Sequence, residues 1–110
     1  MPKRIEQINE LLRKEIALAI ERDVELPDIL ATVTKVECLP ELSEAKVWIS
    51  ILPDNRAGSG LQGLRRQQGL IYNALKKNTV LRRIPKLNFI FDNTEKNVAE
   101  IYKIISDFKS

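Results

Sequence analysis

Histidine is absent from the 110 residues of this sequence, and cysteine occurs only once, as Cys38. Without histidine the chain lacks the usual general base, the Cys–His and Ser–His nucleophile pairs, and the commonest metal ligand. A single cysteine cannot form an intramolecular disulfide, which favours a reducing compartment. The carboxylates have the spacing of solvated helix surfaces, so we expect no catalytic residue, no metal site and no cofactor.

Long apolar runs are also missing. None approaches the roughly 20 residues that a membrane span requires, and residues 1–4 lead into charged sequence without the apolar region of a signal peptide. With 44% hydrophobic and 30% charged residues, the composition is typical of a soluble globular protein. We therefore predict a single domain over residues 1–110 that is cytoplasmic and has no membrane contact. We also expect a monomer when the chain is free, and no small-molecule substrate.

Acidic residues are missing from residues 55–91, which we call the basic segment. This segment carries eight Lys and Arg side chains, whereas residues 1–54 carry 7 basic and 11 acidic ones. The net charge of +3 for the whole chain hides this separation. A cationic region without acids is typical of a surface that binds a polyanion.

The middle of the basic segment, residues 61–78, predicts a helix that is interrupted at Gly69. At about 100° per residue, its apolar and cationic residues fall on opposite sides. Because Gly69 lies among the cations, its missing side chain permits both a kink and the close approach of a phosphate. The apolar side consists of Leu64, Ile71, Ala74 and Leu75, and the other side of Arg65, Arg66, Gly69, Tyr72, Asn73, Lys76 and Lys77.

The first half of the chain predicts a helix followed by two strands. Apolar residues at three- and four-residue spacing predict a helix over residues 3–22. β-Branched residues predict a strand over residues 30–39. In this strand Val33 is out of phase with Val36, so alternation alone does not decide which face of the strand is buried.

Residues 45–52 alternate regularly, with Val47 and Ile49 on one face and Trp48 on the other. A connection of hairpin length precedes them, which predicts an antiparallel sheet with helices over the face that carries Val47. Alternation also predicts a third strand over residues 86–91. An apolar stripe with helical spacing after it predicts a C-terminal helix.

Residues 53–60 form the most loop-like stretch of the sequence. The residues from Gly58 to Gly63 match the G-x-G-x-x-G pattern of dinucleotide-binding sites. Their context differs, because the preceding strand ends near Leu52, several residues before the pattern. A dinucleotide site also needs an acidic residue about 20 positions further on, whereas the next acidic residue after Gly63 is Asp92. We therefore interpret the match as a flexible loop with chance glycines and not as a nucleotide site.

The cations of the basic segment favour a nucleic-acid site. Lys and Arg neutralise phosphates and release counterions, and here they come from the broken helix and from the segment that enters the third strand. Tyr72 could add a stacking contact. An interaction module for an acidic protein partner is the alternative function. A solvated basic face without any partner would also explain a run of charge, but the missing acids and the apolar back of the helix favour RNA or DNA over it. The candidate RNA-binding residues are Arg65, Arg66, Gly69, Asn73, Lys76, Lys77, Arg82, Arg83 and Lys86.

Two motifs carry a more specific signal. The first is Leu42-Ser43-Glu44-Ala45-Lys46-Val47 followed by Trp48, and the second is Arg83-Ile84-Pro85-Lys86-Leu87-Asn88-Phe89. Together with the opening helix, residues 32–37 and residues 65–75, they resemble the bacterial ribosome-binding factor A family over nearly the whole chain.

The resemblance implies an α+β, KH-like fold of type II order with a three-stranded sheet, helices on one face, and a helix–kink–helix at Gly69. It also implies a cytoplasmic factor without catalysis that binds the immature 30S ribosomal subunit, near the 3′ end and neck of its 16S rRNA. Such factors assist late 16S rRNA maturation, especially in the cold, and leave before translation starts.

One position departs from the family pattern, because Gln67 stands where the family has alanine before the kink. On the unkinked helix Gln67 points into the apolar arc, where an unpaired amide costs about 1–3 kcal/mol. We therefore expect either that the kink turns Gln67 to solvent or that its amide is hydrogen-bonded.

Overall fold

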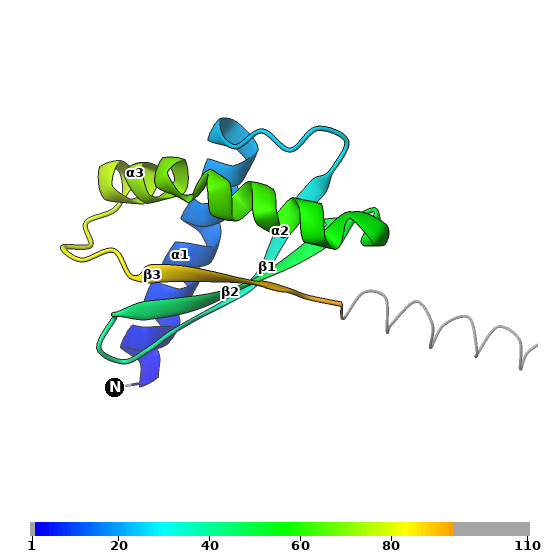
Figure 1. Cartoon of the computed structure of the whole chain (residues 1–110). Helices are drawn as coiled ribbons and strands as arrows, with labels where there is room; N and C mark the ends of the chain where they lie inside the picture. Colours follow the sequence, from blue (N-terminus) through cyan, green and yellow to red (C-terminus); the bar gives the residue numbers. More distant parts are fainter. Residues whose placement is uncertain (1, 94–110) are drawn as a thin grey trace, which may run out of the picture.

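The computed structural model describes residues 2–93, and the predicted C-terminal helix falls outside the described residues. Asp54–Arg56 form one turn of 3-10 helix. No helix in the described part combines the length and the apolar character that a membrane crossing requires. The other elements are α1 (Pro2–Asp23), β1 (Leu30–Cys38), β2 (Glu44–Leu52), α2 (Ala57–Arg66), α3 (Gln68–Asn78) and β3 (Lys86–Phe91) (Figure 1).

The three strands form one sheet in the order β1–β2–β3. β1 and β2 pair antiparallel, as the predicted hairpin requires. β3 pairs parallel with β2, so the complete sheet is mixed and not purely antiparallel. Lys86 N donates to Ser43 O at 3.0 Å at one end of this pairing, and Asp92 N donates to Ile49 O at 2.8 Å at the other. A parallel neighbour needs a crossover connection, which α2 and α3 supply.

The register between β1 and β2 shifts between Val33 and Lys35. The extra residue of this β-bulge changes the phase of the side chains, so Val33 before it and Val36 after it are both buried. The bulge explains why alternation alone did not identify the buried face of β1.

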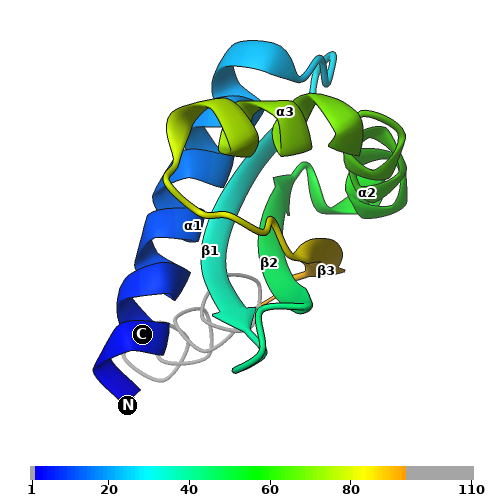
Figure 2. The same ribbon diagram turned by 90° about the vertical axis from the view of Figure 1, so that its left-hand side faces the viewer.

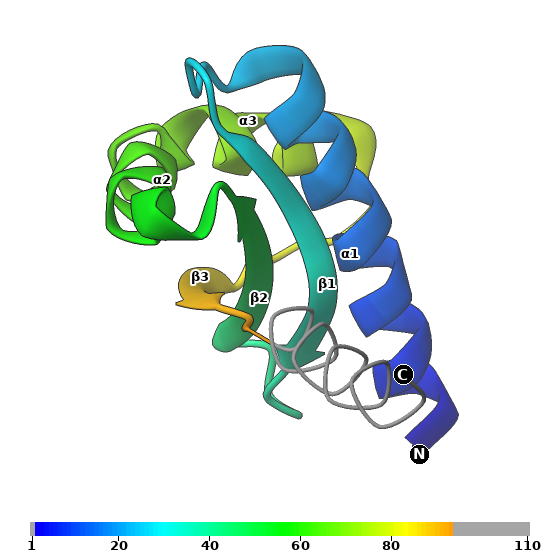
Figure 3. The same ribbon diagram turned by 90° about the vertical axis from the view of Figure 1, so that its right-hand side faces the viewer.

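Helices cover one face of the sheet, as predicted. α1 lies along β1, and α3 crosses the C-terminal end of α1 (Figures 2 and 3). The order α–β–β–α–α–β with this one-sided cover is the expected type II KH-like arrangement. The core between the layers includes Leu12, Ile16, Ala19, Val47, Ile49, Ile51, Leu64, Ile71, Leu75 and Phe89.

The opposite face of the sheet carries Trp48, which is half-buried there as predicted. Lys35 Nζ lies 5.1 Å from the centre of the Trp48 ring. This distance is within the range of a cation–π contact, so the lysine partly covers the exposed side of the indole.

The prediction of a loop over residues 53–60 is wrong for its second half, which belongs to α2. A Cβ atom added at Gly60 would lie 2.8 Å from Ile51 Cδ1, and one added at Gly63 would lie 2.6 Å from Leu26 Cδ2. These two glycines of the G-x-G-x-x-G match are therefore packing positions, which let α2 approach β2 and the segment after α1 closely.

Candidate nucleic-acid interface

The predicted helix–kink–helix is present, but the chain turns at Gln67 and not at Gly69. Gln67 has φ −103° and ψ 14°, whereas Gly69 lies in the first turn of α3 without a positive φ. Gln67 N donates to Gly63 O at 3.1 Å, which closes α2, and Leu70 N donates to Gln67 O at 3.0 Å at the start of α3. The predicted position of the kink is thus corrected by two residues.

The side chain of Gln67 shows why the turn falls there. Its Oε1 accepts a hydrogen bond from Glu25 N at 3.0 Å, and its Nε2 donates to Glu25 O at 2.8 Å. Nε2 also donates to Gly63 O at 3.3 Å. Of the two expected alternatives, the hydrogen-bonded amide is the one observed. It joins the α2–α3 junction to the segment between α1 and β1.

A groove of about 590 Å³ lies between α3 and the segment that leads into β3. It brings together four of the predicted residues, with Gly69 and Asn73 from α3 and with Arg83 and Lys86 from the other side. A Cβ atom added at Gly69 would meet no atom within 4 Å, so the α3 backbone is accessible at this point. The remaining lining residues, most of which sequence reasoning missed, are Ser43, Gln68, Tyr72, Ile84, Pro85 and Leu87.

Lys76 and Lys77 occupy the last turn of α3. Lys76 follows Gly69 and Asn73 at helical spacing, which places all three on one face of the helix. Lys77 lies with Asn73 in a neighbouring hollow beside the C-terminal end of α1. The cationic surface of α3 therefore continues beyond the groove.

Arg65 and Arg66 stand at the end of α2, and only Arg65 has a partner in the described part of the chain. Its Nη2 donates to Phe89 O at 3.3 Å. Backbone groups alternate in direction along a strand, and Lys86 N points to β2, so Phe89 O points to the free edge of β3. Arg65 thus covers part of this edge, a role that the sequence did not predict.

Arg82 does not line the groove. It lies with Arg4 in a hollow of about 560 Å³ between α1 and the segment after α3. Arg83 lines both this hollow and the groove. Val80, in the same hollow, is 95% exposed, so this second cationic surface has an apolar component.

The cations of the basic segment form no ion pair within residues 2–93. Charges that are not neutralised inside the protein remain available to phosphates. The groove and its surroundings are therefore complementary to a polyanion. The ion pairs of this part of the chain are Glu10–Arg13, Arg22–Asp23 and Lys35–Glu37.

Cys38, the only thiol, is buried at 5% exposure beside Asn9, whose Oδ1 accepts a hydrogen bond from Cys38 N at 2.8 Å. Burial raises the pKa of the Cys38 thiol, and the charge of Glu41 raises it further. A raised pKa lowers the thiolate fraction at neutral pH, which makes Cys38 a poor nucleophile. Within residues 2–93, no group of three or more His, Cys, Asp or Glu side chains could hold a metal ion.

Comparison with known proteins gives consistent matches. The sequence model of the family described as "Ribosome-binding factor A" matches residues 4–105. Ribosome-binding factor A of Akkermansia muciniphila is 35% identical over 107 residues, which cover 97% of this chain and 86% of the relative.

Solved structures agree in fold. The crystal structure of ribosome-binding factor A from Thermus thermophilus has a TM-score of 0.72 at 24% identity, covering 79% of this chain and 93% of that chain. A homology model of the Thermus thermophilus ribosome-binding factor A, as fitted into a cryo-EM map of a 30S complex, has a TM-score of 0.68 at 24% identity, covering 77% of this chain and 91% of that chain.

Proposed function

Since the chain belongs to the ribosome-binding factor A family, we propose that it binds the 30S ribosomal subunit through the 16S rRNA. The observation that carries this proposal is the groove in which Gly69 and Asn73 lie together with Arg83 and Lys86. A homology model of the Thermus thermophilus ribosome-binding factor A was fitted into the cryo-EM map of a 30S complex, which supports the same partner.

The groove offers two kinds of contact to an RNA backbone. Arg83 and Lys86 supply charge for phosphates from the side of β3. On the other side, the first turn of α3 lies at a helix N-terminus, where backbone N–H groups attract anions, apart from that of Leu70, which donates to Gln67 O. Because Gly69 has no side chain, a phosphate or a ribose can approach these groups closely.

Tyr72 and Asn73 can add contacts to the bases. Tyr72 lines the groove and is 46% exposed, so part of its side chain is accessible to a base. Asn73 carries both a donor and an acceptor for the polar edge of a base. A single-stranded segment with its bases turned outward fits these contacts better than a regular duplex does.

The function follows from binding energy and not from catalysis. A factor that binds immature 16S rRNA more tightly than mature rRNA shifts the RNA toward the bound conformation and dissociates once maturation removes that preference. The chain would thereby assist late 16S rRNA maturation in the cytoplasm, including at low temperature, and leave the subunit afterwards.

The test is sedimentation of tagged protein from cells. We expect the wild-type chain to sediment with free 30S subunits and not with assembled ribosomes. The double variant Arg83→Gln/Lys86→Gln should leave the 30S fraction, because two phosphate contacts are lost. The matched control Lys14→Gln/Lys35→Gln removes the same charge from exposed positions elsewhere and should sediment normally. Co-sedimentation of the groove variant at wild-type level would contradict the proposal.

An acidic protein partner is the alternative, and the hollow with Arg4, Arg82 and the exposed Val80 is the observation that favours it. The variant Val80→Ser distinguishes RNA binding in the groove from binding of an acidic protein. RNA binding in the groove predicts that Val80→Ser leaves 30S binding unchanged. Binding of an acidic protein predicts that the variant weakens the interaction and that digestion of the RNA does not.

A further inference from the structure

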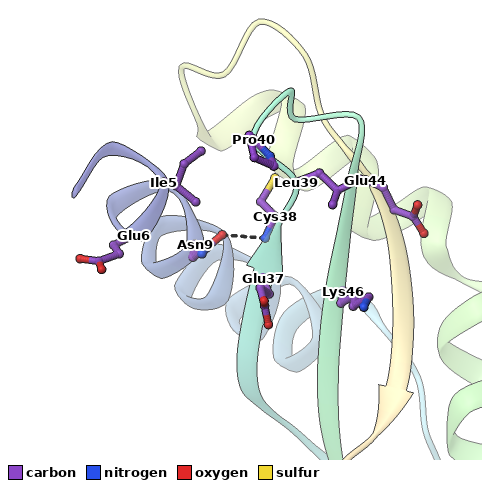
Figure 4. Close-up of a pocket in the computed structure, with 9 residues that line it drawn as sticks. All are labelled: Ile5, Glu6, Asn9, Glu37, Cys38, Leu39, Pro40, Glu44 and Lys46. Atoms are coloured by element: carbon purple, nitrogen blue, oxygen red, sulfur yellow. Dashed lines mark hydrogen bonds between the residues drawn. The ribbon is translucent and has the colours of Figure 1, made fainter. Parts of the chain in front are cut away.

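A hollow on the α1 side of the β1–β2 turn differs from the groove in charge. It has a volume of about 510 Å³ and lies where the N-terminal part of α1 meets the end of β1 and the start of β2 (Figure 4). Four apolar or weakly polar residues gather in it: Ile5, Cys38, Leu39 and Pro40. Of these, Leu39 is 40% exposed, so the hollow opens onto an apolar surface.

Carboxylates surround this apolar centre. Glu6, Glu37 and Glu44 line the hollow, against one cation, Lys46. Glu37 is paired with Lys35 at 3.4 Å. Within residues 2–93, Glu6 and Glu44 form no ion pair, and Figure 4 shows both carboxylates pointing outward on either side of the hollow. These two acids are therefore available to a cationic ligand.

The combination of an apolar centre and free carboxylates selects the class of ligand. RNA is disfavoured, because the carboxylates of Glu6 and Glu44 would repel its phosphates. A peptide with Lys or Arg on both sides of one aliphatic residue satisfies both features. We propose that this hollow binds a short basic peptide segment of a partner protein, which inserts one aliphatic side chain beside Ile5 and Leu39.

This proposal goes beyond RNA binding, because it adds a protein contact on the other side of the β1–β2 turn. Ser43 lines the RNA groove, and the next residue, Glu44, lines the hollow, so the two sites adjoin. Proteins of an RNA-rich particle carry basic segments that neutralise phosphates. Such a segment, lying along the RNA, could reach the carboxylates without leaving the particle.

The test uses the full chain without RNA. A fluorescein-labelled peptide of Lys and Arg residues with a single central Leu is titrated with the protein, and anisotropy is recorded. We expect saturable binding that weakens by about tenfold when the central Leu is replaced by Ser. A peptide that keeps the Leu but carries Gln in place of every Lys and Arg should bind at least about tenfold more weakly.

Variants of the protein locate the site. Glu6→Gln/Glu44→Gln should weaken peptide binding about fivefold, since two exposed ion pairs are lost. Glu21→Gln/Glu25→Gln removes the same charge from positions outside the hollow and should leave binding unchanged. In an NMR titration, the amide signals of Cys38 and Leu39 should shift with the peptide.

Several results would overturn the proposal. Equal binding of the Leu and Ser peptides would reduce the interaction to non-specific attraction between charges. Shifts confined to other residues, the same shifts produced by an RNA oligonucleotide, or shifts produced by self-association of the chain would assign the hollow to another occupant. Failure of the peptide to bind would also overturn the proposal. The peptide titration contains no RNA, so failure of the peptide to bind would not contradict the proposed 30S binding. In the same way, failure of the chain to sediment with 30S subunits would not change the result of the peptide titration.

Discussion

The side-chain amide of Gln67 pairs with the backbone of Glu25 through two hydrogen bonds, of 3.0 and 2.8 Å, across 42 residues of sequence. Through this pair, the start of α3 is fixed relative to the segment that joins α1 to β1. Since α3 forms one side of the groove, the position of that side depends on a contact outside the groove. The turn between the helices is therefore specified by tertiary structure and not by a glycine.

Replacement of Gln67 tests this role. Gln67→Ala should lower the free energy of unfolding by about 1 kcal/mol, because the backbone of Glu25 loses its partners but can still reach water. Urea denaturation followed by circular dichroism measures the change. The neighbour Gln68 is exposed, so Gln68→Ala should change stability little. An equal loss in both variants would contradict the role of the amide pair.

The glycines of α2 should respond to alanine in opposite directions. Gly60→Ala should destabilise the protein by about 1–3 kcal/mol, since the new Cβ would lie 2.8 Å from Ile51 Cδ1 in the core. Gly58→Ala meets no atom within 4 Å and should stabilise α2 by up to about 1 kcal/mol. Thermal unfolding of the two variants gives the comparison. A gain in stability for Gly60→Ala would show that α2 does not pack closely on β2.

Arg65 and Arg66 are neighbours with different expected roles. Arg65→Ala should lower stability by about 0.5–1 kcal/mol, because Phe89 O loses its donor at the edge of β3. Arg66→Ala should leave stability unchanged, since Arg66 is exposed, and should weaken RNA binding. Urea denaturation and filter binding to 16S rRNA separate the two effects. Identical stability of both variants would remove the structural role of Arg65.

Replacement of Gly69 by alanine should raise stability and weaken RNA binding. Gly69→Ala adds a Cβ that meets no protein atom within 4 Å, so it should stabilise α3 by up to about 1 kcal/mol. The same methyl group should weaken RNA binding about tenfold if a phosphate or ribose approaches the backbone there. Gly58→Ala is the matched control, with the same open surroundings in α2 but outside the groove. Unchanged RNA affinity of Gly69→Ala would exclude close approach at this position.

Much of the fold is encoded in local patterns that the sequence displays. Helical spacing of apolar residues predicted α1 within one residue at either end, and alternation predicted β3 at its observed bounds. The apolar side of the broken helix, with Leu64 and Ile71, is buried as predicted. These features depend on neighbours in sequence, which a periodicity captures.

Features that depend on distant partners could not be predicted. The bulge beside Val33 is set by pairing with β2, and the need for a glycine at position 60 by the closeness of Ile51. Gln67 finds its partner in Glu25, and Arg65 finds its partner in Phe89. The candidate site is consequently divided, because Arg83 and Lys86 meet Gly69 in the groove while Arg82 lies on another surface.

The salt dependence of RNA affinity tests the central claim most directly. Binding of the wild-type chain to 16S rRNA should weaken linearly in a plot of log affinity against log salt concentration. For Arg83→Gln/Lys86→Gln the slope should decrease by roughly 1.4–1.8, which corresponds to two lost phosphate contacts, while Lys14→Gln/Lys35→Gln keeps the wild-type slope. Equal slopes for the wild-type chain and the groove variant would contradict RNA binding in the groove.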